Sequence, residues 1–96
     1  MKPSVVLNEH RDAVRAIVLA HRARNPRVFG SASRGEDTTS SDLDLLIEPT
    51  GETTLLDIGA IRHELGDLLG VDVDVVTPLA LPAGFRERVI AEAVPV

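Results

Sequence analysis

The stretch that decides the fold is residues 29–48, FGSASRGEDTTSSDLDLLIE. It places Gly30 and Ser31 directly after a short apolar run, where we expect a strand to end. Backbone N–H groups at the start of a helical turn, with the Ser31 hydroxyl beside them, are suited to hold phosphate oxygens. Asp42 and Asp44 follow at the start of the next expected strand, and carboxylates are hard oxygen ligands for metal ions. The stretch therefore predicts a site that holds a polyphosphate through metal ions.

The segment DLDLLIE, residues 42–48, alternates in a way that fixes its geometry. On a strand, Asp42 and Asp44 share one face while the aliphatic residues between them point to the core. Alternate side chains lie ~6.5 to 7 Å apart, so both carboxylates can converge on one pair of metal ions. Two Mg²⁺ ions about 3.5 to 4 Å apart can hold a triphosphate, polarise the phosphorus and stabilise the leaving pyrophosphate. We therefore expect Asp42 and Asp44 to be catalytic metal ligands.

A third carboxylate comes from VDVDVV, residues 71–76. Its valines at positions 71, 73 and 75 form the buried side of a strand, which places Asp72 and Asp74 on the other face. We expect Asp74 to complete the shell of the catalytic metal and to help deprotonate the attacking hydroxyl. Asp72 points the same way and is a reserve candidate.

Each of these residues also has a purely structural interpretation. Asp42 can cap a turn, and Asp44 and Asp74 can be solvated charges on half-buried strands. The combination of a glycine-serine turn, a pair of aspartates and a later aspartate favours the metal site. Arg34 stays open between two roles: its guanidinium can contact the triphosphate, or it can pair with Glu36 or Asp37.

Other phosphate and metal motifs fit this chain poorly. Gly30 and Gly35 have the glycine spacing of a P-loop, but Glu36 and Asp37 occupy its lysine and hydroxyl positions and would repel phosphate. An EF-hand loop and a serine-nucleophile elbow fail on their required glycines. The histidines lie on predicted helices, away from the aspartates and without the spacing of a metal cluster: His10, His21 and His63.

Length and composition indicate one domain over residues 1–96. The chain has 96 residues, no cysteine and 44% hydrophobic residues, with no apolar run near the ~18 residues of a membrane span. Its N-terminus lacks an apolar secretory core, so we expect a cytoplasmic protein. Residues 1–35 carry seven Lys or Arg against two acids, and residues 36–96 carry three against thirteen. With only two aromatic residues and no continuous basic stripe, general nucleic-acid binding is not expected.

The remaining periodicity predicts an α/β (α+β) fold, a small mixed β-sheet covered by helices. Helices are expected over residues 4–23, ending before Asn25 and Pro26, and over 53–69, with Thr53 or Thr54 as cap and Gly70 as stop. A last helix is expected from Pro82 onward. The buried stripe of the second is expected to include Leu55, and that of the last Phe85 and Ile90. Strands are expected at 27–29, 42–48 and 71–76, with a helical turn at 31–34, a polar loop at 35–40 and a short apolar tail, AVPV.

The stretch GSASRGEDTTSSDLDLLIE resembles the signature of the DNA polymerase beta nucleotidyltransferase superfamily. The short chain, the strand VDVDVVTP and the ending LPAGFRERVIAEAVPV are similar to the minimal nucleotidyltransferases, which form toxin-antitoxin pairs with HEPN-domain proteins. The resemblance implies a nucleotidyltransferase fold core in which Gly30 and Ser31 hold phosphate. It also implies that Asp42 and Asp44 bind Mg²⁺ and that Asp74 is the third carboxylate.

The same resemblance implies an antitoxin that transfers AMP from ATP to a tyrosine hydroxyl on its HEPN partner and thereby silences the partner's ribonuclease activity. The chain has no extra domain to form the acceptor side of a cleft, so a separate folded partner would complete the pocket and align the hydroxyl. Two alternatives stay open. One is a binding antitoxin that inhibits by covering its partner and keeps the site as a nucleotide sensor. The other is a small-molecule nucleotidyltransferase, acting for example on an antibiotic, which the missing acceptor domain disfavours.

Overall fold

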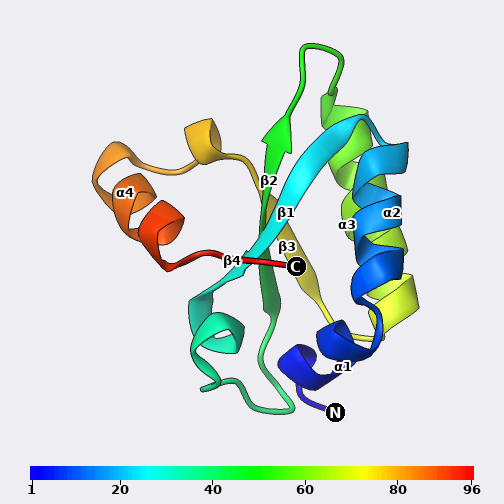
Figure 1. The fold of residues 1–96 in the computed structure, drawn as a ribbon, viewed down its shortest axis with the longest axis vertical. Helices are drawn as coiled ribbons and strands as arrows, with labels where there is room; N and C mark the ends of the chain where they lie inside the picture. The colour runs from blue at the N-terminus through cyan, green and yellow to red at the C-terminus, as the bar shows by residue number, and fades with distance from the viewer.

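The computed structural model describes residues 1–96 and confirms the predicted α/β class. A four-stranded mixed sheet in the order β3-β2-β1-β4 is covered by helices (Figure 1). Strand β1 is antiparallel to both β2 and β4, whereas β2 and β3 are parallel. The elements are α1 (Pro3–Glu9), α2 (Arg11–Ala20), β1 (Ala23–Phe29), the 3₁₀ turn η1 (Gly30–Arg34), β2 (Leu43–Pro49), α3 (Leu55–Leu69), β3 (Val73–Val76), the 3₁₀ turn η2 (Pro78–Ala80), α4 (Ala83–Glu92) and β4 (Val94–Pro95).

The parallel pair depends on α3, which connects β2 to β3. Its start confirms Thr54 as the cap: Thr54 Oγ1 accepts from Asp57 N, and the Asp57 carboxylate accepts from Thr54 N, which satisfies two otherwise free amides. Its end confirms Gly70 as the stop, with φ of 68°. The prediction that Leu55 lies in the buried stripe is wrong, because Leu55 is 87% exposed. It opens the helix, and the first buried apolar residue of α3 is Ile61.

The single helix predicted over residues 4–23 is two helices, α1 and α2, separated at His10. The backbone leaves the helical region there, with φ −130° and ψ 25°, and the ring Nδ1 of His10 lies 3.0 Å from Val6 O. The bend allows buried residues of both helices to reach one core: Val6, Leu7, Val14 and Val18. Tertiary packing therefore overrides a continuous helical pattern.

Strand β1 is longer than the predicted residues 27–29 and begins at Ala23. The pair Asn25 and Pro26 was expected only to follow the end of the first helix, but it forms an irregularity within the strand. The register with β2 shifts between Arg24 and Arg27, and Asn25 has φ of 50°. A bulge accommodates a left-handed residue and a proline that cannot donate to the ladder.

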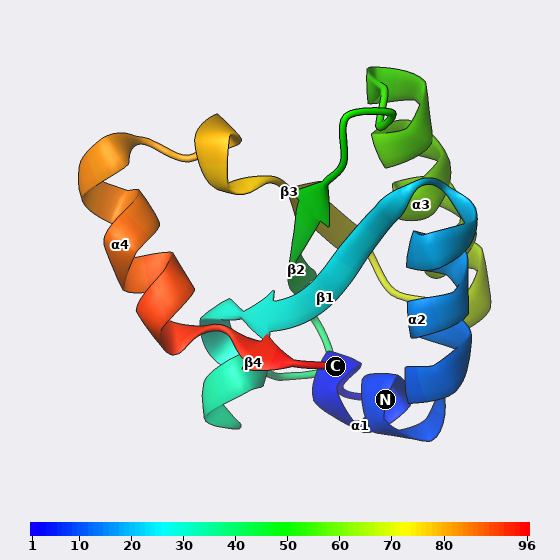
Figure 2. The ribbon, with the colours of Figure 1, turned by 45° about the horizontal axis from the view of Figure 1, so that its top comes forward.

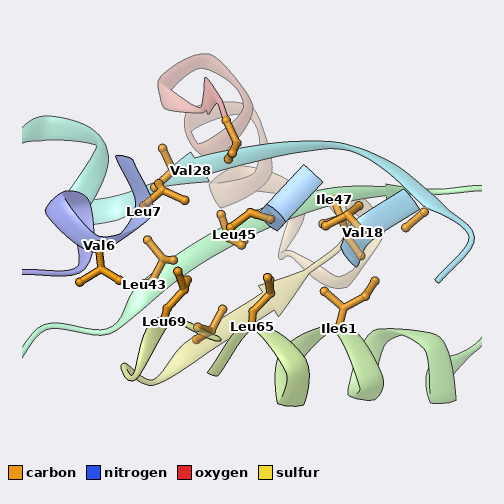
Figure 3. Packing of buried hydrophobic residues seen from close by; sticks show 14 residues of the cluster. Val6, Leu7, Val18, Val28, Leu43, Leu45, Ile47, Ile61, Leu65 and Leu69 are labelled. Carbon is orange, nitrogen blue, oxygen red and sulfur yellow. The ribbon is translucent and has the colours of Figure 1, made fainter. Parts of the chain in front are cut away.

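Two apolar clusters lie on opposite faces of the sheet. The larger has 14 buried residues and packs α1, α2 and α3 against the strands; Figure 3 shows Ile61 and Leu65 directed toward the aliphatic side chains of β2. The smaller has four buried residues and attaches α4 to the other face (Figure 2): Phe29, Leu46, Leu81 and Val89. Fully buried Leu46 therefore shares the face of Asp44, as the alternation of β2 requires.

The last segment differs from prediction in two ways. Phe85 and Ile90 were expected in the buried stripe of α4, but they are 49% and 42% exposed, because the small cluster takes only Leu81 and Val89 from this region. The tail is not a loose end. It forms β4 on the free edge of β1, where Val94 pairs with Val28 (Figure 2). None of the helices is both long and apolar enough to cross a lipid bilayer.

Candidate functional site

The sheet register brings two of the predicted acids side by side. Asp44 and Asp74 are each the second residue of their strands, β2 and β3, and they are direct partners in the parallel ladder. Asp74 therefore lies on the same surface as Asp44. Asp42 precedes β2, and its charge is close enough to raise the pKa of Asp44. Asp44 and Asp74 thus lie side by side where the parallel strands β2 and β3 begin, and Asp42 stands two residues before Asp44 in the chain.

The electrostatic state of Asp44 differs from that of an isolated carboxylate. Burial is the largest cause that raises the pKa of Asp44, and the negative charges of Asp74, Asp42 and Glu92 raise it further. No arginine or lysine compensates these charges at Asp44 itself. A divalent cation would do so, since an opposite charge favours the ionised form. This concentration of unbalanced negative charge is what a metal site needs.

The glycine-serine turn packs directly on Asp44. Phe29 is the register partner of Asp44, and Gly30 follows it with φ of 75°, a conformation that L side chains rarely adopt. A Cβ at Gly30 would lie only 2.5 Å from Asp44 Oδ2. The turn η1 then runs to Arg34, closed by Ser33 Oγ donating to Gly30 O at 2.7 Å. The half-buried Ser31 is thereby held in the turn next to the carboxylate cluster.

Arg34 makes ion pairs with two glutamates. Its Nε donates to Glu36 at 3.0 Å, and its Nη1 contacts Glu92, the last residue of α4. The expected pairing with Glu36 is confirmed. The other expected partner, Asp37, does not pair with Arg34: it is buried under α1, where its carboxylate accepts from Ser4 N at 2.8 Å and Ser4 Oγ at 2.9 Å. Burial raises the pKa of Asp37, but the hydrogen bonds from Ser4 outweigh it, and the net shift is downward.

Glu92 was missed by the sequence analysis. Its carboxylate accepts from Gly30 N at 3.2 Å and pairs with Arg34, so it joins the end of α4 to the turn. The hydrogen bond from Arg34, and then that from Gly30, lower the pKa of Glu92. Because these contacts span about sixty residues of sequence, local spacing gives no signal for them.

The donor set fits Mg²⁺ without forming a complete metal site. The available ligands are carboxylate oxygens, which Mg²⁺ prefers, and Asp44 lies under a glycine whose missing Cβ leaves its Oδ2 uncovered. No group of three or more acidic or histidine side chains is already gathered at metal-binding distances. The residues that fit the ion are therefore Asp42, Asp44 and Asp74, with further oxygens to come from phosphate or water.

A surface hollow of about 650 Å³ lies beside the carboxylates on the side of α3. It includes Asp42 and Asp72 but neither Asp44 nor Asp74. His21 pairs with Glu64 and His10 lies at the α1–α2 break, away from the carboxylates. His63 pairs with Asp67, and both line the hollow.

Comparison with known proteins gives matches over almost the whole chain. The family model described as a nucleotidyltransferase domain matches residues 7–96. MJ0435 of Methanocaldococcus jannaschii, which bears the name of a protein adenylyltransferase, is 34% identical over 94% of this chain and 97% of its own length. A solved minimal nucleotidyltransferase structure has a TM-score of 0.89 and 42% identity, covering 100% of this chain and 97% of the other. A toxin-antitoxin structure with AMP-PNP shares the fold, with a TM-score of 0.75 and 20% identity over 93% of this chain and 72% of the other.

Proposed function

Because the chain belongs to the nucleotidyltransferase family and is by homology a nucleotidyltransferase, we propose that it is a protein adenylyltransferase. It transfers AMP from ATP to a hydroxyl, that of a tyrosine, on a partner HEPN toxin, and acts as the antitoxin. The observation that carries this proposal is the register pairing of Asp44 with Asp74 beside the turn at Gly30. The relative named for protein adenylyl transfer and the AMP-PNP complex of a structural neighbour support it.

Each site residue then has a defined role. Asp42 and Asp44 hold two Mg²⁺ ions together with Asp74, and Mg²⁺ supplies positive charge at the leaving pyrophosphate. The N–H groups of Gly30 and Ser31, the Ser31 hydroxyl and the Arg34 guanidinium hold phosphate oxygens. Asp74 accepts the proton of the acceptor hydroxyl while the hydroxyl oxygen forms its bond to the α-phosphorus. The bond from the α-phosphorus to the bridging oxygen breaks, and pyrophosphate leaves.

A macromolecular acceptor is supported by what lies around the carboxylates. They are bordered by exposed residues and by the polar hollow beside α3. Exposed Phe85 and Ile90 on α4 provide apolar surface on the same side of the sheet as Asp44. A folded partner seated there would both bury these residues and present a hydroxyl to the site.

The test is incubation of the chain with ATP, Mg²⁺ and the HEPN protein, followed by intact mass measurement of both proteins. We expect the partner to gain the mass of AMP and to lose its ribonuclease activity. Asp44→Asn should abolish the gain. The matched control is Asp12→Asn, an exposed carboxylate on α2 that should leave the gain unchanged. An unmodified partner with intact inhibition would contradict catalysis and identify a binding antitoxin.

A further inference from the structure

The phosphate-binding groups proposed above are already occupied by an anion that belongs to the chain. Gly30 N donates to Glu92 Oε2 at 3.2 Å, and Arg34 Nη1 contacts Glu92 Oε1, so each oxygen of one carboxylate takes one donor. A backbone N–H at a turn together with an arginine is the donor pair that a phosphate group takes. The Glu92 carboxylate therefore lies where a phosphate would bind.

The position of Glu92 also adds negative charge to the acid cluster. Glu92 accepts from the amide of Gly30, the residue that packs on Asp44 Oδ2, so its charge lies close to that of Asp44. An approaching triphosphate consequently meets a carboxylate that competes for Gly30 and Arg34 and also repels phosphate. Glu36 provides a contrast, because it pairs with Arg34 but makes no contact with Gly30.

We propose that Glu92 is an internal substitute for phosphate, which holds the Gly30 amide and the Arg34 guanidinium in the nucleotide-free chain and is displaced when a metal-bound triphosphate binds. The proposal rests on the proposed function, since it requires these two donors to bind nucleotide phosphate. Glu92 then sets the affinity for nucleotide. It keeps the Gly30 amide and the Arg34 guanidinium oriented, and it excludes ligands that cannot compete with an intramolecular carboxylate.

The contacts argue against a purely structural surface pair. An ion pair whose role is only to fasten α4 would need Arg34 alone, and Arg34 already has Glu36 as a second partner. The additional hydrogen bond goes to the amide next to Asp44, in the turn where a Cβ would not fit. The Glu92 carboxylate therefore contacts both of the groups proposed to bind phosphate, the Gly30 amide and the Arg34 guanidinium.

The experiment is a calorimetric titration of three proteins: the wild type, Glu92→Gln and Glu36→Gln. Each is titrated separately with Mg²⁺-AMP-PNP and with Mg²⁺-tripolyphosphate. Glutamine keeps the shape and an oxygen for Gly30 but removes the charge. We expect Glu92→Gln to bind both probes roughly three- to tenfold more tightly, as loss of one half-exposed ion pair and of one like charge allows. Glu36→Gln should change affinity by less than about twofold. Because tripolyphosphate has no nucleoside, a gain in affinity for it would show that Glu92 competes with the phosphate groups.

Equal or weaker binding by Glu92→Gln, with wild-type binding intact, overturns the substitute role and assigns Glu92 to positioning Arg34. If neither the wild type nor Glu92→Gln binds either probe, the proposed function fails along with the inference. Failure of the inference alone is thus distinguished from failure of the proposed function. Should Glu92→Gln not fold, Glu92→Asp tests the contacts instead of the charge: it keeps the carboxylate but shortens the side chain, and it should also bind tripolyphosphate more tightly than the wild type, equal or weaker binding again overturning the substitute role. As a second readout, the Gly30 amide resonance should shift when tripolyphosphate binds the wild type and should already be displaced in free Glu92→Gln.

Discussion

Two aspartates, Asp57 and Asp44, lie in contrasting electrostatic environments. Asp57 is only 3% exposed, yet its carboxylate is fully paired: Arg22 Nε donates at 3.1 Å and Thr54 N at 2.9 Å. The hydrogen bond from Arg22 and that from Thr54 lower the pKa of Asp57 to about 2. At Asp44, burial and three neighbouring acids raise the pKa instead. The comparison teaches that one carboxylate is paired within the fold, whereas the other has no compensating positive charge of its own, which is what the proposed metal site requires.

The largest expected difference between the two aspartates is in catalysis. Asp44→Asn should lower the rate of AMP transfer by on the order of 10³-fold, because charge stabilisation at the reacting phosphate is lost. Asp57→Asn should stay within about threefold of the wild type at temperatures where it is folded. The measurement is incorporation of labelled AMP into the partner under saturating ATP. Equal losses in both variants would remove the distinction.

In thermal stability the order of the two variants reverses. Asp57→Asn should lower the Tm by roughly 5–10 °C, because the charged hydrogen bond to Arg22 is lost at a buried position. Asp67→Asn is the matched control, since its carboxylate on the same helix is 76% exposed. Thermal unfolding followed by circular dichroism gives both values. A Tm of Asp57→Asn equal to that of the control would show that the pair with Arg22 contributes nothing.

The acid dependence of stability should follow Asp57. Its pKa in the folded state, about 2, lies below the ordinary value of 3.8, so its contribution is present above pH 3.8 and is lost as the pH falls toward 2. Urea unfolding between pH 5 and pH 2 should therefore show a steeper loss of stability for the wild type than for Asp57→Asn. Parallel curves would mean that other carboxylates dominate this range.

The cap of α3 separates the two contributions of Asp57. Thr54→Ala removes the acceptor for Asp57 N but leaves the pair with Arg22, and it should lower stability by about 1 kcal/mol. Thr54→Ser retains the hydroxyl and should be close to the wild type. Chemical denaturation of these two variants tests this, and an effect of Thr54→Ser as large as that of Thr54→Ala would assign the loss to packing of the methyl group.

The smallest effect is expected at Asp44 in the absence of metal. Asp44→Asn should raise the Tm by roughly 2–5 °C, because the ionised form is disfavoured in the folded state and the amide removes the repulsion. Added Mg²⁺ with ATP should then raise the Tm of the wild type but not that of Asp44→Asn. A lower Tm of Asp44→Asn without Mg²⁺ would place Asp44 in the same class as Asp57.

Sequence periodicity predicted the parts of the molecule that depend on local pattern. The alternation around Asp44 and Asp74 predicted two strands with the acids on one face, and the two residues are register partners in the sheet. The Thr54 cap and the Gly70 stop are likewise local signals, and both were confirmed. The roles of Asp42, Asp44 and Asp74 as metal ligands, and those of Gly30 and Ser31 as phosphate ligands, remain predictions.

The features that were missed depend on partners distant in sequence. Nothing near Glu92 indicates that it reaches Gly30, and nothing near Asp57 indicates that Arg22 covers it. The break at His10 and the bulge at Asn25 have the same origin, because packing of the whole core decides them over local preference. Phe85 and Ile90 were assigned to the core from their amphipathic spacing. Spacing alone does not show how much of a helix's apolar stripe the sheet can cover, and both residues are exposed.

The unequal size of the two apolar clusters has a consequence for motion. Only four buried residues attach α4 to the sheet, against 14 in the cluster on the opposite face. The free energy of local unfolding is lower where fewer apolar contacts must be broken, so α4 should open while the larger core stays intact. Amide hydrogens of α4 would then exchange with solvent faster than those of α3, and the face of the sheet that carries Asp44 would be uncovered in brief, repeated openings.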